Sequence, residues 1–270
     1  MTQNSPSPEQ HLLNSKLNSK EDLLALLAYC EEHIAKDPTL AAFWRRQSYC
    51  LARLGRYREA IGSYQKTLAL VTENPKVWCN YASALAASGQ LSKSINAYDR
   101  SLDLEPTYGN AWRRRGNALY RLGEYVRAIE SYDQALALAP TDSRLWYAKG
   151  LATFQLNLAE QAINHFKIAI ENNTDNREAY TALIYALISA GRYTETRQFL
   201  ESLFAQGWND AYLHDCYAYL LQQQGDGQAA RKHLQQAIEN NPQYANLWFR
   251  MGLILTQLNH YSEAHNAFRE

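Results

Sequence analysis

The 270-residue sequence has no excess charge of either sign, because 27 lysine and arginine residues balance 27 aspartate and glutamate residues. Zero formal net charge disfavours a non-specific binder of polyanions, although it leaves room for a local patch. Cysteine is also scarce. Cys30, Cys50, Cys79 and Cys216 contain no C-x-x-C pair, so we expect reduced thiols rather than disulfides or a metal site.

Long apolar runs are absent as well. No stretch approaches the roughly 20 residues needed to cross a bilayer, so no membrane span is expected. Residues 1–8 have neither a basic start nor an apolar stretch, which does not fit the pattern of a secretory signal. We therefore expect a cytoplasmic protein. A hydrophobic fraction of 46% is ordinary for a folded chain and argues against disorder.

The sequence lacks the motifs that carry catalysis or hold cofactors. Its seven histidines show no H-E-x-x-H or other metal-ligand spacing, and there is no glycine-rich phosphate loop or nucleophile elbow. His214 is expected to be a packed ring rather than a base. The sequence thus predicts a protein that is not an enzyme and that binds neither a cofactor nor a metal.

What the sequence does contain is a repeat of 34 residues. The interval separates Trp44, Trp78, Trp112, Trp146, Tyr180, His214 and Trp248, with no insertion or deletion. A period of this size indicates one supersecondary unit stacked on copies of itself, so that each copy buries its apolar face against its neighbours. The tryptophans are expected to be packing residues.

Three further positions keep the same interval. Glycine or asparagine, which tolerate the left-handed backbone that ends a helix, stand at Gly55, Gly89, Gly123, Asn157, Gly191, Gly225 and Asn259. A small or short side chain, suited to a close helix crossing, follows at Ala60, Ser94, Ala128, Ala162, Thr196, Ala230 and Ala264. One helical turn later, a bulky apolar residue stands at Tyr64, Tyr98, Tyr132, Phe166, Leu200, Leu234 and Phe268.

These residues resemble the tetratricopeptide repeat. The family pattern is nearly complete in Trp112, Gly116, Gly123, Glu124, Tyr125, Ala128, Tyr132, Ala135 and Pro140. The residue sequence of the repeats is similar to that of bacterial and especially cyanobacterial repeat proteins. The resemblance implies an all-α fold, a right-handed α-solenoid of stacked antiparallel helix pairs. Arg115 stands where the family commonly has leucine, and we expect its stem on the core and its charged head in water.

The repeat also divides the chain. Residues 1–18 are expected to be a flexible tail, and residues 19–40 a degenerate half-repeat that caps the array, with the Ser19 hydroxyl capping its helix. An irregular junction is expected at residues 206–210, where Trp208 stands in place of a closing proline. Seven repeats of two helices each are expected at 41–74, 75–108, 109–142, 143–176, 177–210, 211–244 and 245–270, the last incomplete.

In the tetratricopeptide family the first helix of each repeat lines a groove that binds a peptide or a partner's helix. Helical spacing makes the outward stripe of these helices basic in the N-terminal half of the chain and aromatic in the C-terminal half. Arginine captures carboxylates or phosphates through paired bonds, and tyrosine is often a binding hot spot. The candidate partner-binding residues are Arg45, Arg46, Tyr49, Arg53, Lys76, Asn80, Arg113, Arg114, Asn117, Tyr120, Arg121, Arg144, Tyr147, Phe154, Tyr185, Tyr219 and Phe249.

The sequence therefore predicts a protein–protein interaction scaffold or adaptor that binds an acidic or amphipathic segment of a partner. A solvated helix face is the competing interpretation of the arginines. Some family members grip a partner's terminal carboxylate with a fixed set of residues, of which Asn80 and Arg114 fit here whereas Tyr49 and Asn110 do not. Nucleic acid is disfavoured by the acidic second helices and the neutral total.

Two alternatives concern the carboxyl end. The last repeat stops within its second helix, which leaves apolar surface without the capping helix that repeat arrays normally have. The chain could be the N-terminal sensor or targeting arm of a larger enzyme or signalling protein, truncated after Glu270. Self-association through the open end, at Tyr261 and Phe268, is the other hypothesis.

Overall fold

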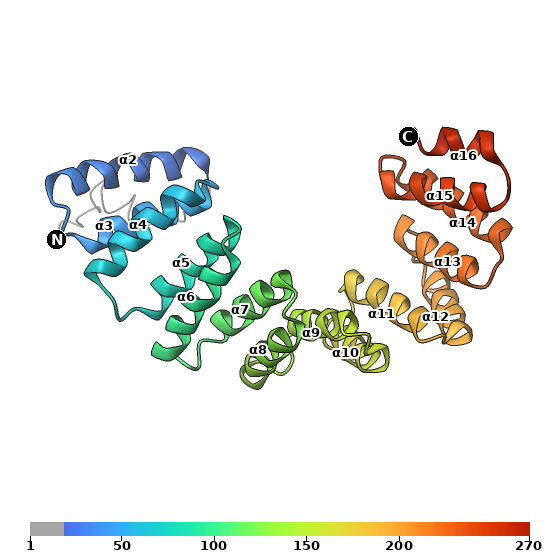
Figure 1. Ribbon diagram of the computed structural model, residues 1–270, viewed down its shortest axis with the longest axis horizontal. Helices are drawn as coiled ribbons and strands as arrows, with labels where there is room; N and C mark the ends of the chain where they lie inside the picture. Colours follow the sequence, from blue (N-terminus) through green and yellow to red (C-terminus); the bar gives the residue numbers. More distant parts are fainter. Residues whose placement is uncertain (1–18) are drawn as a thin grey trace, which may run out of the picture. The chain divides into compact units, whose positions relative to one another are not determined.

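The computed structural model describes residues 19–270, and in that range the chain forms fifteen α-helices and no strand (Figure 1). The all-α fold of stacked antiparallel helix pairs is thus confirmed. The predicted tail, residues 1–18, lies outside the described residues. The helices are α2 (Lys20–Lys36), α3 (Ala41–Arg53), α4 (Tyr57–Leu70), α5 (Pro75–Ala87), α6 (Leu91–Leu104), α7 (Gly109–Leu122), α8 (Tyr125–Leu138), α9 (Ser143–Gln155), α10 (Ala159–Asn172), α11 (Arg177–Ser189), α12 (Tyr193–Ala205), α13 (Ala211–Gln223), α14 (Gly227–Asn240), α15 (Ala245–Gln257) and α16 (Tyr261–Ala267).

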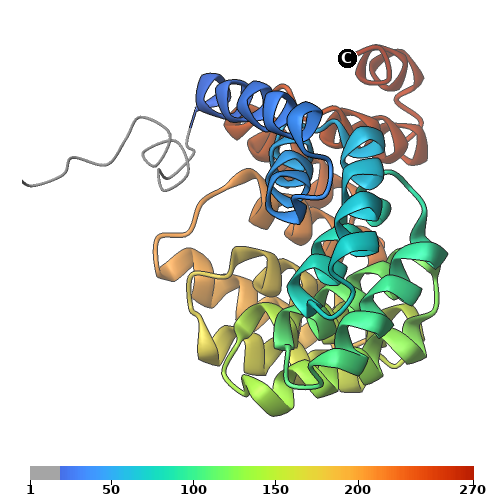
Figure 2. The ribbon, with the colours of Figure 1, turned by 90° about the vertical axis from the view of Figure 1, so that its left-hand side faces the viewer.

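The chain forms two compact units, of which the first ends at Pro140 and the second begins at Thr141. In the first unit α3 contacts α5 and α5 contacts α7, so the first helices of successive pairs lie side by side. In the second unit α9, α11 and α13 are in contact in the same way. Each unit thus has a face made of first helices, which we call its first-helix face. Figure 2 shows α2 of the first unit lying over α3.

The helix α2 begins at a capping box, as the sequence predicts. The backbone N–H of Asp22 donates to Oγ of Ser19 over 3.0 Å, and the backbone N–H of Ser19 donates to a carboxylate oxygen of Asp22 over 3.3 Å. Two backbone groups that would otherwise lack partners at the helix start are therefore satisfied. The buried side chains Leu26, Leu27 and Cys30 fix which face of α2 packs against the array.

The helix ends also follow the prediction. Glycine or asparagine at all seven expected positions has a positive φ, from 61° at Asn157 to 85° at Gly89 and Gly123. The left-handed backbone lets each first helix stop and the chain reverse into the second helix within a few residues. Gly207 also has a positive φ, of 86°, in the expected irregular junction after α12.

The repeated tryptophans are half-buried and have a polar role that the sequence does not predict. In four of them the indole N–H donates to the backbone carbonyl six residues earlier, in the connection before the helix. The pairs are Trp44 with Pro38 (2.9 Å), Trp78 with Thr72 (2.8 Å), Trp112 with Pro106 (2.8 Å) and Trp248 with Pro242 (2.9 Å). These four tryptophans therefore connect the first helices α3, α5, α7 and α15 to the turns that precede them, in addition to packing.

Two helices of a pair meet where a small residue faces a bulky one sixteen positions later. A Cβ atom added to Gly116 would lie 2.5 Å from Cε1 of Tyr132, and one added to Gly150 would lie 2.5 Å from Cε1 of Phe166. At the equivalent position Ile184 is larger, and there the later residue is the smaller Leu200, with both fully buried. Side-chain volume is therefore balanced across the crossing, as close packing requires.

Arg115 corrects an expectation, because its charged head is not in water. Its side chain is only 14% exposed, and Nε lies 2.6 Å from Oδ1 of Asp99. Its Nη1 donates to Oγ of Ser131 over 2.7 Å. Asp99 belongs to α6 and Ser131 to α8, so Arg115 of α7 joins the second helices of two successive pairs. The carboxylate of Asp99 and the hydroxyl of Ser131 accept hydrogen bonds that the guanidinium would otherwise donate to water.

His214 is a packed ring, as predicted, and belongs to a pair of histidines. Its Nε2 lies 2.6 Å from Oδ1 of Asn209, and its Nδ1 lies 3.1 Å from Nδ1 of His233. Because an amide oxygen only accepts, Nε2 of His214 carries the proton, and Nδ1 of His214 then accepts from His233. Burial lowers the pKa of both histidine rings. The negative charge of Asp210 partly opposes this shift at His214. Repulsion from His214 lowers the pKa of His233 further.

Exchange of Gly116 for alanine is expected to destabilise the fold. The new Cβ would overlap the ring of Tyr132, and overpacking of this kind costs about 1–3 kcal/mol. Gly62 is the matched control, since it lies inside α4 with nothing within 4 Å of an added Cβ. Gly62→Ala should stabilise by about 0.5–1 kcal/mol. Urea unfolding followed by circular dichroism measures both, and a Gly116→Ala chain as stable as the parent would contradict the packing argument.

The histidine pair is expected to make stability depend on pH. The folded-state pKa values lie below the unfolded value of about 6.5, so the unfolded chain takes up protons first as the pH falls below that value. The free energy of unfolding should therefore fall between pH 7.5 and pH 5.5. Urea unfolding at these two pH values should show a smaller fall for the His214→Phe/His233→Phe chain. Replacement of the exposed His265 by glutamine is the control, and an unchanged fall in the double variant would refute the assignment.

Candidate functional site

A groove lined by arginine lies on the first-helix face of the first unit. It runs between α5 and α7, has a cavity volume of about 320 Å³, and its lining includes no carboxylate. We call it the arginine groove. Its lining residues are Ser83, Ala86, Ala87, Tyr98, Arg113, Arg114, Asn117, Ala118 and Arg121.

Neutral groups hold the three guanidinium groups in place. Arg114 donates from Nη1 to Oγ of Ser83 over 2.6 Å, and Arg113 donates from Nη2 to Oδ1 of Asn110 over 2.9 Å. Arg121 donates from Nη1 to the backbone carbonyl of Ala86 over 3.1 Å. None of the three arginines forms an ion pair with another of residues 19–270. Their positive charge is therefore positioned but not neutralised.

The uncharged hydroxyls of the lining residues Ser83 and Tyr98 form the floor of the arginine groove. Oγ of Ser83 lies 3.0 Å from the hydroxyl of Tyr98, and the hydroxyl of Tyr132 donates to Oδ1 of Asn117 over 2.9 Å. Burial raises the pKa of Tyr98 to about 12, so this hydroxyl is uncharged at neutral pH. With a neutral floor and a cationic rim, the groove offers hydrogen-bond donors to a carboxylate or a phosphate.

The structure narrows the predicted basic stripe. Arg113, Arg114, Asn117 and Arg121 come together in the arginine groove, whereas the other predicted residues do not line it. Arg53 instead donates to the hydroxyl of Tyr49 over 3.2 Å. The predicted residues outside the groove are Arg45, Arg46, Tyr49 and Arg53 of α3, Lys76 and Asn80 of α5, Tyr120 of α7, which contacts Tyr125, and Arg144 of the second unit, which pairs with Asp142.

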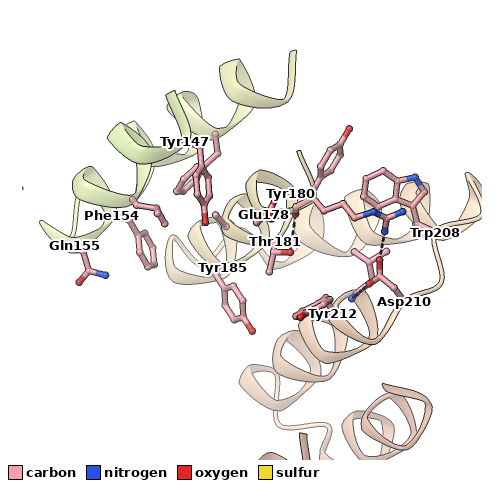
Figure 3. A pocket seen from close by; sticks show the side chains of 15 residues that line it. Tyr147, Phe154, Gln155, Glu178, Tyr180, Thr181, Tyr185, Trp208, Asp210 and Tyr212 are labelled. Atoms are coloured by element: carbon pink, nitrogen blue, oxygen red, sulfur yellow. Dashed lines mark hydrogen bonds and ion pairs between the residues drawn. The ribbon is translucent and has the colours of Figure 1, made fainter. Parts of the chain in front are cut away.

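The second unit contains an aromatic pocket with a cavity volume of about 550 Å³. Of the predicted aromatic residues, Tyr147, Phe154 and Tyr185 line it, whereas Tyr219 and Phe249 do not. Figure 3 shows Tyr147, Phe154 and Tyr185 projecting into the space between α9 and α13. The full lining is Tyr147, Leu151, Phe154, Gln155, Phe166, Arg177, Glu178, Tyr180, Thr181, Ala182, Tyr185, Trp208, Asp210, Tyr212 and Leu213.

The rings of the aromatic pocket are supported by other rings. The support restricts their orientation, because neighbouring aromatic rings favour offset or edge-to-face contacts over free rotation. The pocket therefore presents its aromatic faces in a largely preformed arrangement. The supporting pairs are Tyr147 with Phe166 (centroids 6.0 Å apart), Tyr185 with Tyr219 (5.3 Å), Tyr212 with Tyr244 (5.9 Å) and Trp208 with Tyr180 (4.7 Å).

Sequence reasoning missed one wall of the pocket, which the irregular junction forms. The guanidinium of Arg177 lies over Trp208, 4.4 Å from the ring centroid, and donates to the carboxylate of Asp210. Asp210 also caps α13 by accepting from the backbone N–H of Leu213 over 3.0 Å. The signal in the sequence was Trp208 itself, an aromatic residue at a position where other repeats have proline.

A largely buried ion pair, Arg250 with Asp215, was also missed; its side chains are 18% and 13% exposed. Nη1 of Arg250 lies 2.5 Å from Oδ1 of Asp215, and the hydroxyl of Tyr185 lies 3.3 Å from Oδ2. Burial raises the pKa of Asp215, whereas Arg250 lowers it. Arg250 follows Trp248 by two residues, as Arg114 follows Trp112, and each arginine reaches back to the preceding repeat. The repeat position of Arg114 was therefore a usable signal for Arg250.

The last helix leaves apolar side chains exposed. Tyr261 is 64% exposed and Phe268 is 45% exposed. The ring of Phe268 nevertheless contacts Phe249, with centroids 5.7 Å apart, and lies over Gly252. Phe249 thus packs against Phe268, the residue that follows α16, and does not line the aromatic pocket. Self-association through this end stays a prediction.

Other kinds of site are not supported by the described part of the chain. Residues 19–270 contain no group of three or more histidine, cysteine, aspartate or glutamate side chains placed to hold a metal ion. No helix in this range has the length and apolar character needed to cross a bilayer. All four cysteines are buried free thiols.

Comparison with known proteins agrees with this geometry. No curated protein matches the chain. Among solved structures, the C-terminal part of a TPR repeat-containing protein from Cytophaga hutchinsonii is 18% identical, with a TM-score of 0.69, covering 88% of this chain and 96% of that one. A tetratricopeptide repeat protein from Parabacteroides merdae is 19% identical, with a TM-score of 0.63 and coverage of 87% and 93%. YrrB, a TPR protein with an unusual peptide-binding site, is 20% identical, with a TM-score of 0.54 and coverage of 68% and 95%.

Sequence models of the tetratricopeptide repeat match most of the chain. The matches cover residues 47–77, 80–143, 147–211 and 221–270. Together with the helix pairs, the left-handed helix ends and the small residues at the crossings, they leave one assignment. The chain belongs to the tetratricopeptide repeat family, whose members are generally protein-interaction modules rather than enzymes.

Proposed function

We propose that the protein is a non-enzymatic scaffold or adaptor whose arginine groove binds an acidic segment of a partner protein. The observation that carries the proposal is the set of three guanidinium groups, Arg113, Arg114 and Arg121, in a groove without a carboxylate. A bound aspartate or glutamate would supply the missing charge. Hydrogen bonds to charged groups are worth about 1.5–3 kcal/mol, more than a neutral bond of the same geometry.

The arrangement fits a binding groove better than a solvated helix face. Solvated arginines extend freely into water, whereas Arg113 and Arg114 are half-buried and bonded to neutral acceptors of α5 and α7. Because these bonds restrict the side chains before a ligand arrives, less conformational entropy is lost on binding. The peptide-binding site of the similarly folded YrrB gives further support.

The same groove would serve the alternative expected from the sequence, an arm of a larger enzyme or signalling protein, because binding requires no chemistry from this chain. We propose a cytoplasmic location on the basis of the four buried free thiols, which suit a reducing compartment. The binding role of the groove depends on the partner being a protein, which the tetratricopeptide fold favours.

The arginine groove is tested with labelled ten-residue peptides in a fluorescence anisotropy titration. A peptide of alternating glutamate and alanine should bind and should weaken as salt is added, because the charges become screened. Exchange of Arg113 and Arg121 for glutamate should weaken binding at least tenfold, since two charge-assisted contacts are lost.

The control carries the same change of charge outside the groove, at the exposed residues Arg58 and Arg100. It should bind the acidic peptide within about threefold of the parent, since only screened long-range attraction is altered. Equal losses in both variants, or equally tight binding of an alternating lysine–alanine peptide, would show that the groove does not select carboxylates.

A further inference from the structure

The aromatic pocket of the second unit carries a charge of its own. Arg177, the cation in its lining, is already paired with Asp210 and lies over Trp208. Glu178 is exposed and makes no hydrogen bond or ion pair with any of residues 19–270. In Figure 3 Glu178 lies between Tyr147 and Trp208. Because Arg177 and Asp210 neutralise each other, the carboxylate of Glu178 is the remaining charge of the pocket lining.

The rings themselves are suited to a cation. The face of an aromatic ring is electron-rich and attracts a guanidinium or ammonium group within about 6 Å of its centroid. The second unit already uses its rings in this way. The guanidinium of Arg177 lies 4.4 Å from the centroid of Trp208, and that of Arg250 lies 5.1 Å from the centroid of Tyr219.

Three classes of side chain could enter a pocket of this kind, and the charges separate them. A carboxylate would be repelled by Glu178 and would gain nothing from the ring faces. An aliphatic side chain would gain apolar contact but would leave Glu178 unused. A basic side chain gains contact with the rings and an ion pair with Glu178, and an arginine also stacks flat on an aromatic ring.

We propose that the aromatic pocket binds an arginine side chain of a partner protein, with its guanidinium among Tyr147, Tyr185 and Tyr212 and its charge facing Glu178. The chemistry is thus opposite to that of the arginine groove. The inference rests on the proposed function in one respect, that the ligand is a protein segment. It is otherwise independent of the arginine groove, because the two sites lie in different compact units and share no residue.

The test uses the whole chain labelled with ¹⁵N, and follows the indole N–H signal of Trp208, identified by its loss in Trp208→Phe. The probes are the N-acetyl methylamides of arginine, lysine, norleucine and glutamate. The arginine derivative should shift the Trp208 signal in a saturable way that weakens with salt. At the same concentrations the norleucine and glutamate derivatives should cause little shift. A saturable shift with the lysine derivative would also support a cation site.

Two pairs of variants separate charge from ring contact. Glu178→Gln should raise the dissociation constant for the arginine derivative about threefold, whereas Glu171→Gln, a matched change at an exposed carboxylate outside the pocket, should leave it unchanged. Tyr212→Ala should raise it about two- to fivefold. Phe249→Ala is the control for Tyr212→Ala, since both side chains are more than half exposed and only Tyr212 lines the pocket.

A norleucine derivative that shifts Trp208 as strongly as arginine would overturn the proposal in favour of an apolar pocket. A Glu178→Gln chain with unchanged affinity, or no saturable shift with arginine, would overturn it as well. Binding of the acidic peptide to the arginine groove is measured in parallel and should be unaffected by Glu178→Gln. The failure of one site therefore does not imply the failure of the other.

Discussion

The close crossing of two helices in each pair is the constraint on which the rest of the structure depends. Gly116 lies so near the ring of Tyr132, and Gly150 so near that of Phe166, that neither position has room for a Cβ atom. At the equivalent position Ile184 is larger than glycine, and its partner Leu200 is smaller than tyrosine or phenylalanine. The combined side-chain volume at the crossing is therefore similar even though the residue types differ. Because successive pairs meet the same packing constraint, the pairs stack in succession within each unit, and the first helices of each unit form one face.

On that face the position within the repeat determines what a side chain can reach. Arg114 and Arg250 follow their tryptophans by two residues, and each contacts the preceding repeat, at Ser83 and at Tyr219 respectively. The outcome differs because of one neighbour. Asp215 neutralises Arg250 inside the second unit, whereas Arg114 meets only neutral acceptors and keeps its charge available. One scaffold thereby produces a structural ion pair in one place and a cationic groove in another.

The irregular junction gives the second unit its distinct chemistry. A proline at position 208 would only end a helix, but Trp208 supplies a ring that contacts Tyr180 and carries the guanidinium of Arg177. The next residue, Asn209, accepts from His214 and so links this connection to the histidine pair. The departures from the repeat pattern in this unit therefore lie where the aromatic pocket forms.

The sequence by itself determined the all-α fold, the left-handed residues that end the first helices, and the small buried residues of the second helices, because these depend on local backbone conformation and on a strict period. It also placed arginine and aromatic side chains on first helices. Only the tertiary structure decided which of them meet. Arg113, Arg114 and Arg121 share a groove while Arg45 does not, and Arg115 is half-buried and paired with Asp99. Such pairings join residues of different helices, and whether a charge is neutralised depends on neighbours that the spacing of a single helix does not reveal.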